Sequence, residues 1–277
     1  MSDLILLDRV TYRYDDGTVA LDRCTLPIVF GEKCAILGMN GSGKTTLLMH
    51  LNGLLKPAEG RVLVEGHPLG YDRQSLRALR KRVGILFQNP DSQLFSASIR
   101  EDVSFGPVNL GLPRDEVTRR VDWSLAMVGL GSIEERPVHA LSFGQKKRAA
   151  LAGVLAMEPE ILLLDEPFAG LDPPMTRELA AILHRLSEEG RTIVVATHDI
   201  DFAVAWSDRI VVMEKGVVAC RLSPDQLFDT PHLLEPHGFS PPTMPLVIDL
   251  LRVHGVKFPG GPPRSLTGLR ELLSPPQ

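Results

Sequence analysis

The stretch CAILGMNGSGKTTLLMHL, residues 34–51, passes from an apolar run through a glycine-rich loop into a helical pattern. Within it, GMNGSGKT at 38–45 matches GxxxxGK[ST], in which glycines let backbone N–H groups face a phosphate at a helix N-terminus. A glycine-rich turn that carries lysine and threonine by chance is the alternative. The motif predicts a nucleotide-binding loop made of Gly38, Met39, Asn40, Gly41, Ser42, Gly43, Lys44, Thr45 and Thr46, with Thr45 also offering a hydroxyl to Mg²⁺.

A second motif, ILLLDEP at 161–167, is an apolar strand pattern that ends in two carboxylates. In a buried parallel sheet they would lie at the carboxyl edge, where α/β folds bind ligands. We expect Asp165 to hold Mg²⁺ and Glu166 to orient and polarise an attacking water. A helix cap or turn is the other interpretation of the pair. Together with the glycine-rich loop, the pair indicates phosphoryl transfer.

The rest of the chain predicts an α/β fold. Apolar runs at 161–164 and 192–196 flank a helical stretch at 175–189, as in a buried parallel sheet. Residues 4–14 and 60–66 are typical of a peripheral antiparallel sheet. We therefore expect a P-loop NTPase parallel sheet core, an antiparallel β subdomain, an inserted helical lobe at about 90–155 and a small C-terminal appendage. The predicted boundaries are 1–222 for the ATPase domain and 223–277 for the appendage, which holds 11 of the 22 prolines and has dimerisation as its candidate role.

Composition limits the partners. With 30 basic and 34 acidic residues, the net charge of −4 argues against nucleic acid, which normally leaves a basic footprint. The three cysteines, Cys24, Cys34 and Cys220, have no metal-ligand spacing. No run of about 18 apolar residues is present, so any membrane role has to come through a partner.

After these motifs, residues 141–145, LSFGQ, resemble the LSGGQ signature of ABC transporter ATPases, with Phe143 in place of a glycine. The resemblance extends from Leu4 to about Val218. Taken alone, Ser142 and Gln145 form a capping box for a helix that starts near Lys146. The resemblance implies that Ser142, Phe143, Gly144 and Gln145 contact ATP held by another subunit. Asp172, in AGLDP, would couple the two sites of a dimer, although Ala169–Gly170 departs from the commoner Ser-Ala.

Three further positions match the family residue by residue. Gln88, in VGILFQNP, matches the glutamine that reaches Mg²⁺ and water, and an ordinary loop amide is the alternative. His198, in VVATHD, matches the histidine that contacts the γ-phosphate, although a lone histidine is usually structural. Tyr14 matches the aromatic residue that stacks on adenine, and a strand aromatic in a small core is its alternative.

Residues 83–110 resemble the ATPases of energy-coupling-factor importers, in particular the cobalt and nickel (CbiO-like) branch. Vitamin importers of the same group share much of this pattern. The resemblance implies a groove for a transmembrane coupling protein, formed by Asp91, Gln93, Leu94 and Phe95. Leu94 and Phe95 could equally be core residues of the helical lobe.

The sequence thus predicts the ATP-binding and ATP-hydrolysing subunit of such an importer, peripheral to the cytoplasmic face of the cell membrane, with ATP and Mg²⁺ as cofactors. Expected partners are a second copy or a paralogous ATPase, a transmembrane coupling protein and a substrate-binding membrane component. A soluble ABC ATPase acting on nucleic acid and a solitary P-loop kinase or NTPase are the rival functions. The first usually has two fused ATPase domains or a long coiled coil, and the LSFGQKKR run argues against the second.

Overall fold

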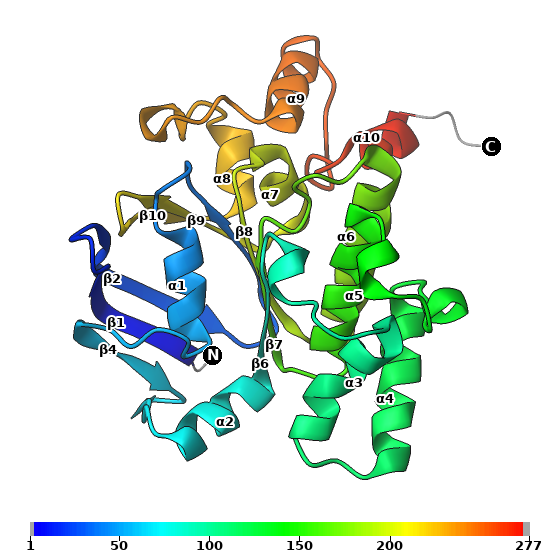
Figure 1. The fold of residues 1–277 in the computed structure, drawn as a ribbon. Coiled ribbons are helices and arrows are strands. Elements are labelled where there is room, and N and C mark those ends of the chain that lie inside the picture. Colours follow the sequence, from blue (N-terminus) through cyan, green and yellow to red (C-terminus); the bar gives the residue numbers. More distant parts are fainter. Residues whose placement is uncertain (1–2, 274–277) are drawn as a thin grey trace.

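Two sheets organise residues 3–273, the part of the chain that the computed structural model describes (Figure 1). The larger has the strand order β10-β9-β3-β8-β7-β6 and is parallel except for β10. Its strands are β3 (Lys33–Leu37), β6 (Val83–Leu86), β7 (Ile161–Asp165), β8 (Thr192–Thr197), β9 (Arg209–Glu214) and β10 (Val217–Leu222). The smaller is antiparallel, in the order β2-β1-β4-β5, with β1 (Asp3–Arg13), β2 (Val19–Val29), β4 (Glu59–Val64) and β5 (His67–Pro68). The predicted fold class is confirmed.

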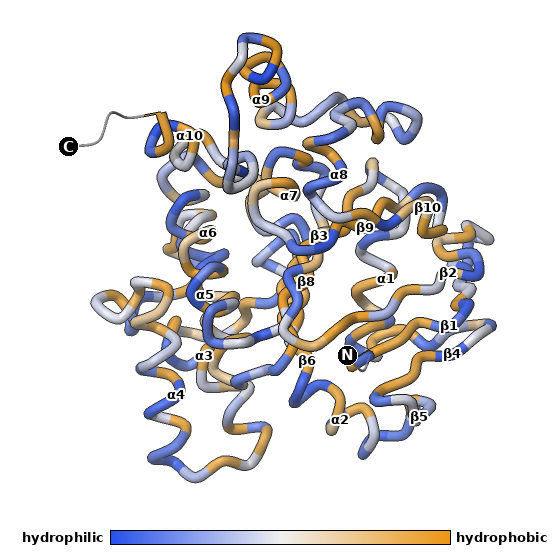
Figure 2. The backbone as a smooth tube through the Cα atoms, turned by 180° about the vertical axis from the view of Figure 1, so that it is seen from behind, coloured by the Kyte–Doolittle hydropathy of each residue, from blue (hydrophilic) through white to orange (hydrophobic). Residues whose placement is uncertain are grey.

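The central strands are buried on both faces, which explains their continuous apolar runs. Side chains alternate between the two faces along a strand. In β7, Leu162 and Leu164 point to the core of the helical lobe, whereas Ile161 and Leu163 point to the core under the antiparallel sheet. Figure 2 shows the apolar segments gathered in the middle of the molecule, where these strands run.

Helix α1 (Lys44–Leu51) lies between the two sheets (Figure 1). Its Leu47, Leu48 and Leu51 are fully buried in the core that the two sheets share. Helix α1, which follows the phosphate loop, is therefore fixed from both sides.

Helix α2 (Arg73–Arg82) begins at the N-cap Asp72, whose side chain accepts hydrogen bonds from the N–H groups of residues 74 and 75.

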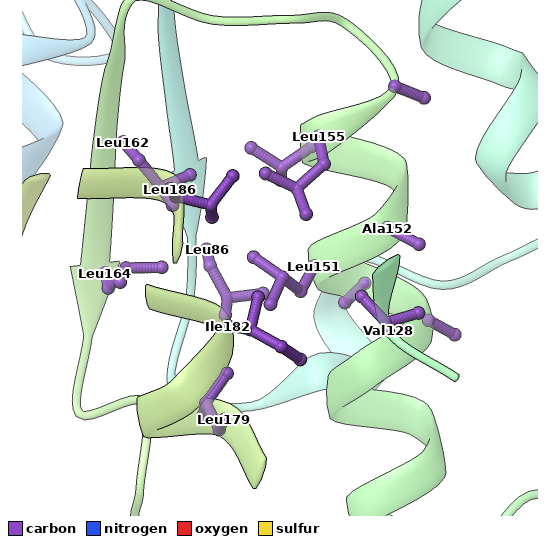
Figure 3. Packing of buried hydrophobic residues seen from close by; sticks show 14 of the residues in the cluster. Leu86, Val128, Leu151, Ala152, Leu155, Leu162, Leu164, Leu179, Ile182 and Leu186 are labelled. Atoms are coloured by element: carbon purple, nitrogen blue, oxygen red, sulfur yellow. The ribbon is translucent and has the colours of Figure 1, made fainter. Parts of the chain in front are cut away.

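The helical lobe covers the other face of the larger sheet. It consists of α3 (Ile99–Asn109), α4 (Arg114–Met127) and α5 (Phe143–Leu155), and α6 (Pro173–Glu188) packs beside it. Figure 3 shows Leu151 and Leu155 of α5 directed towards Leu162 and Leu164 of β7. Helix α5 begins at Phe143, three residues before the predicted start, because Ser142 is the N-cap and Gln145 closes the capping box. Short 3-10 turns at Pro90–Ser92, Gly131–Ile133 and Val138–Ala140 connect this region.

The C-terminal appendage packs on the same sheet. After α7 (Ile200–Trp206), it contains α8 (Pro224–Asp229), the 3-10 turn Glu235–His237, α9 (Thr243–Val253) and α10 (Leu266–Leu273). Phe228 and Ile248 of the appendage share a buried cluster with Ala35 and Leu37 of β3. The appendage thus has no separate core, and the domain boundary near residue 222 stays a prediction; residues 274–277 lie outside the described part.

Several elements were not predicted from the sequence. Strand β2 reads VALDRCTLPIV, and its Asp22, Arg23 and Pro27 interrupt the apolar pattern. Pro27 is tolerated because β2 is the edge strand of its sheet. Strands β6, β9 and β10 were missed as well.

None of the helices within residues 3–273 is long and apolar enough to cross a membrane.

Candidate active site

The glycine-rich loop joins β3 to α1 in a conformation that needs glycine. Gly43, the N-cap of α1, has φ of 101°. A Cβ atom there would collide with the carbonyl oxygen of Ala20 in β2. The first N–H groups of a helix have no partners within it, so the start of α1 presents donors and the positive end of the helix dipole to an anion.

The two predicted motifs meet at the carboxyl end of β7. Thr45 Oγ1 donates a hydrogen bond of 2.6 Å to Asp165 Oδ2. Lys44 is buried, and its Nζ donates to the Gly38 carbonyl at 2.6 Å and lies 3.6 Å from Glu166 Oε1. Residues 120 positions apart in the chain therefore form one cluster of hydroxyl, ammonium and carboxylate groups.

Glu166 is held from several directions although it is not a glycine and has φ of 44°. Its N–H donates to the Ala196 carbonyl at 2.9 Å. Thr197 Oγ1 lies 3.3 Å from Glu166 Oε2, and His198 Nδ1 lies 3.0 Å from Oε1. The predicted His198 thus contacts the second carboxylate, and the side chain of Glu166 is only 10% exposed.

A cavity of about 350 Å³ opens over this cluster. The loop from 40 to 46 lines it, together with Gln88, Tyr14 and both carboxylates. The Tyr14 hydroxyl is hydrogen-bonded to Thr46 Oγ1 at 3.0 Å. Gly38 and Met39 are not among its lining residues; the carbonyl of Gly38 instead binds Lys44, and Met39 is exposed.

The residues of the LSFGQ run lie apart from this cavity. Ser142 and Phe143 are exposed at the start of α5, and Gly144 is buried against Met175. Gln145 is engaged in the capping box. Asp172 caps α6 by accepting a 2.8 Å bond from the Met175 N–H. Ser142 to Gln145 and Asp172 are therefore not brought to the phosphate loop of their own chain.

The four residues predicted to meet a membrane partner have different surroundings. Asp91 forms a 2.7 Å ion pair with Lys146. Gln93 is used locally, since it binds the N–H of Phe87 and the carbonyl of Ile85. Leu94 packs against the lobe core, whereas Phe95 is 64% exposed and its ring lies edge-on to another exposed ring, that of Phe105, with 4.7 Å between the ring centroids.

Several residues around the site were missed from the sequence. Thr18, Val19 and Ala20 line the cavity because β2 lies beside the loop. Lys147 is buried below Glu166 and donates to its carbonyl oxygen at 2.9 Å. Its spacing was a signal, because Phe143, Lys147 and Leu151 are four residues apart and share one helix face.

Burial controls the charges here. It raises the pKa of the Asp165 carboxyl, an effect that the hydrogen bond from Thr45 opposes. Burial also lowers the pKa of the Lys147 ammonium to about 8, and the carboxylates of Glu166 and Asp165 oppose that shift. Two buried carboxylates and two buried lysines thus balance one another.

This fold and site define a P-loop nucleoside-triphosphate-binding protein. The family model described as ABC transporter matches residues 21–169. The chain is 43% identical over 240 residues to the energy-coupling factor transporter ATP-binding protein EcfA of Methanocaldococcus jannaschii, covering 87% of this chain and 86% of the relative. It is also 43% identical over 274 residues to the cobalt import ATP-binding protein CbiO of Rhodobacter capsulatus, covering 99% and 97%.

Solved structures of ATP-binding cassettes are also similar to this chain. Clostridium perfringens cbiO1, described as part of the ABC transporter complex cbiONQ, gives a TM-score of 0.76 at 43% identity and covers 91% of this chain and 100% of that one. A dimeric ATP-binding cassette in a post-hydrolysis state with ADP and Pi gives 0.73 at 31% identity, covering 79% and 98%. The chain belongs to the ABC transporter ATPases, within the energy-coupling factor transporter ATP-binding proteins. It is an ATP-binding ATPase subunit.

Gly43→Ala tests the loop geometry. The new methyl group would displace the loop from β2, so we expect ATP affinity to fall by about tenfold or more, measured by calorimetry. Gly66→Ala is the matched control, because Gly66 also has positive φ, of 81°, but open space around it. Equal ATP affinity in the two variants would contradict the assigned role of the loop contact.

Proposed function

We propose that this chain powers an energy-coupling factor importer for cobalt or nickel ions from the cytoplasmic face of the cell membrane. The observation that carries the proposal is the joining of Lys44 and Thr45 to Asp165 and Glu166 at one cavity. The name of the Rhodobacter relative, matched over 99% of this chain, favours cobalt as cargo. A vitamin is the alternative cargo.

The donor atoms fit Mg²⁺. A threonine hydroxyl and a carboxylate lie 2.6 Å apart, and Gln88 lines the same cavity. Mg²⁺ prefers oxygen ligands and is usually bound through one or two carboxylates together with substrate phosphates. In the proposal Thr45, Asp165 and Gln88 hold the ion, which neutralises phosphate charge when bound.

The remaining residues position ATP and water. The backbone of the loop from Gly38 to Thr46 and the ammonium of Lys44 bind the phosphates. Glu166 orients the attacking water, and His198, which already contacts this carboxylate, reaches towards the γ-phosphate. Tyr14 offers its exposed ring to adenine while its hydroxyl is held by Thr46.

The active unit in this proposal is a dimer with two shared ATP sites. Ser142 and Phe143 are exposed at the N-terminus of α5, where unpaired N–H groups and the helix dipole favour a phosphate. With Gly144, Gln145 and Asp172 they would meet the ATP held by the second copy. The dimeric form of a structural relative supports this arrangement. ATP then stabilises the closed pair, and hydrolysis reopens it.

The membrane partners would bind on the helical lobe. The exposed rings of Phe95 and Phe105 and the carboxylate of Asp91 could receive a basic amphipathic helix of a transmembrane coupling protein. Gln93 and Leu94 would support this surface from within. A substrate-binding membrane component would complete the transporter, and nucleic acid has no part in it.

Glu166→Gln tests the hydrolytic role. The amide keeps the shape of the side chain but cannot act as a base, so we expect ATP binding within about twofold of wild type and hydrolysis slower by about 100-fold or more. Size-exclusion chromatography with ATP should show dimer accumulating. Glu188→Gln, at an exposed position of α6, is the control. Normal turnover by the Glu166 variant would refute the role.

The cargo is tested with the complex that co-purifies with the full-length chain, reconstituted in vesicles. We expect ATP-dependent uptake of ⁵⁷Co²⁺ or ⁶³Ni²⁺, lost in the Glu166→Gln complex. Uptake of a vitamin such as riboflavin, without metal uptake, would replace the proposed cargo while leaving the ATPase assignment intact.

A further inference from the structure

Lys147 is a buried cation to which neither the family motifs nor the proposed function gives a role. It lies on the second turn of α5 and is 2% exposed. Its Nζ donates two hydrogen bonds of 2.9 Å, one to the carbonyl of Glu166 and one to the carbonyl of Ala169. Burying an ammonium is costly unless it is paired, so a lysine kept here indicates a demand for these contacts.

Both acceptor carbonyls belong to the turn that begins at Glu166, the second of the two buried carboxylates. The Ala169 N–H donates to the Glu166 carbonyl at 3.2 Å and closes the turn. Glu166 has a positive φ, a strained conformation that a non-glycine residue keeps only where its surroundings hold it. Lys147 thus binds the backbone of the strained residue itself.

A second contact also joins the start of α5 to the turn that follows Glu166. The ring of Phe143 lies against Gly170, where an added Cβ would meet the ring at 2.8 Å. Lys147 Nζ also lies 5.6 Å from the centroid of that ring. Phe143 and the Ala169–Gly170 pair both depart from the family motifs they resemble, and in the structure Phe143 touches Gly170.

We propose that Lys147 is a positioning residue, which clamps the start of α5 to the 166–170 turn and so sets where the Glu166 carboxylate points. The inference rests on the proposed role of Glu166. Because Ser142 caps the same helix, any shift of α5 when Ser142 meets a second copy's ATP is transmitted to Glu166 through this clamp. Hydrolysis is thereby tied to engagement of the partner copy.

The physical basis is geometric rather than ionic. The Lys147 ammonium points at carbonyl oxygens, while its contacts with the two carboxylates act only at longer range. Misplacing a reacting group by about 1 Å can cost about 100-fold in rate, whereas substrate binding need not change. The clamp is therefore expected to affect kcat and not ATP affinity.

Lys147→Met tests the clamp in the full-length chain, since methionine keeps a long apolar side chain but donates no hydrogen bonds. We expect kcat for ATP hydrolysis to fall by about tenfold or more, while the dissociation constant for ATP stays within about twofold of wild type. Lys147→Gln retains two N–H donors on a shorter side chain and should lose only about three- to fivefold. Lys81→Met, at an exposed position of α2, is the matched control.

A merely structural role predicts a different result. In that case Lys147→Met lowers the melting temperature, but kcat per folded molecule stays within about twofold of wild type. That outcome overturns the clamp, and so does a loss of rate that arises only from weaker ATP binding. If the methionine variant does not fold, the glutamine variant decides by the same two readouts. Normal turnover by Glu166→Gln would instead refute the proposed function on which the clamp depends.

Discussion

Two carboxylates, Asp165 and Glu166, are buried at the carboxyl end of β7, and the rest of the site follows from the need to balance them. Ionised carboxylates are expensive to bury without partners. Thr45 and Lys44 supply partners from the glycine-rich loop, whereas Lys147 binds the backbone carbonyl of Glu166 and meets the two carboxylates only at longer range. The same charges suit a cation and a triphosphate, so what stabilises the fold locally also forms the binding site.

The surrounding architecture fixes these groups from separate directions. Alternation along β7 and β8 divides their side chains between two cores, so that the strand ends are rigid on both faces. One core contains residues of α1, which follows the phosphate loop, and the other contains Leu141 and residues of α5, which begins within the LSFGQ run. The site therefore lies where two independently packed layers meet. A shift of one layer against the other would change the distance between Glu166 and the loop without unfolding either core.

Much of the site could be predicted because its residues follow strand and helix ends. The rule that parallel strands end at one edge placed Asp165 beside Thr45, and the capping pattern placed Ser142 at a helix start. Strand β2 could not be predicted because polar residues and Pro27 break its pattern at a sheet edge. Lys147 was harder to recognise for another reason: in the run Gln-Lys-Lys-Arg it resembles a solvated basic segment, and only its four-residue spacing from Phe143 and Leu151 indicated the buried face on which tertiary packing places it.

The central claim is that each ATP is held by the loop of one copy and the start of α5 in another. Mixing two inactive chains, Lys44→Ala and Ser142→Arg, tests it most directly by the ATPase rate of the mixture. Half of the dimers that form at random would be mixed, and each mixed dimer would contain one intact site out of two. An equal mixture should therefore recover roughly a quarter of the wild-type rate. A mixture no more active than the separate chains would contradict the shared site.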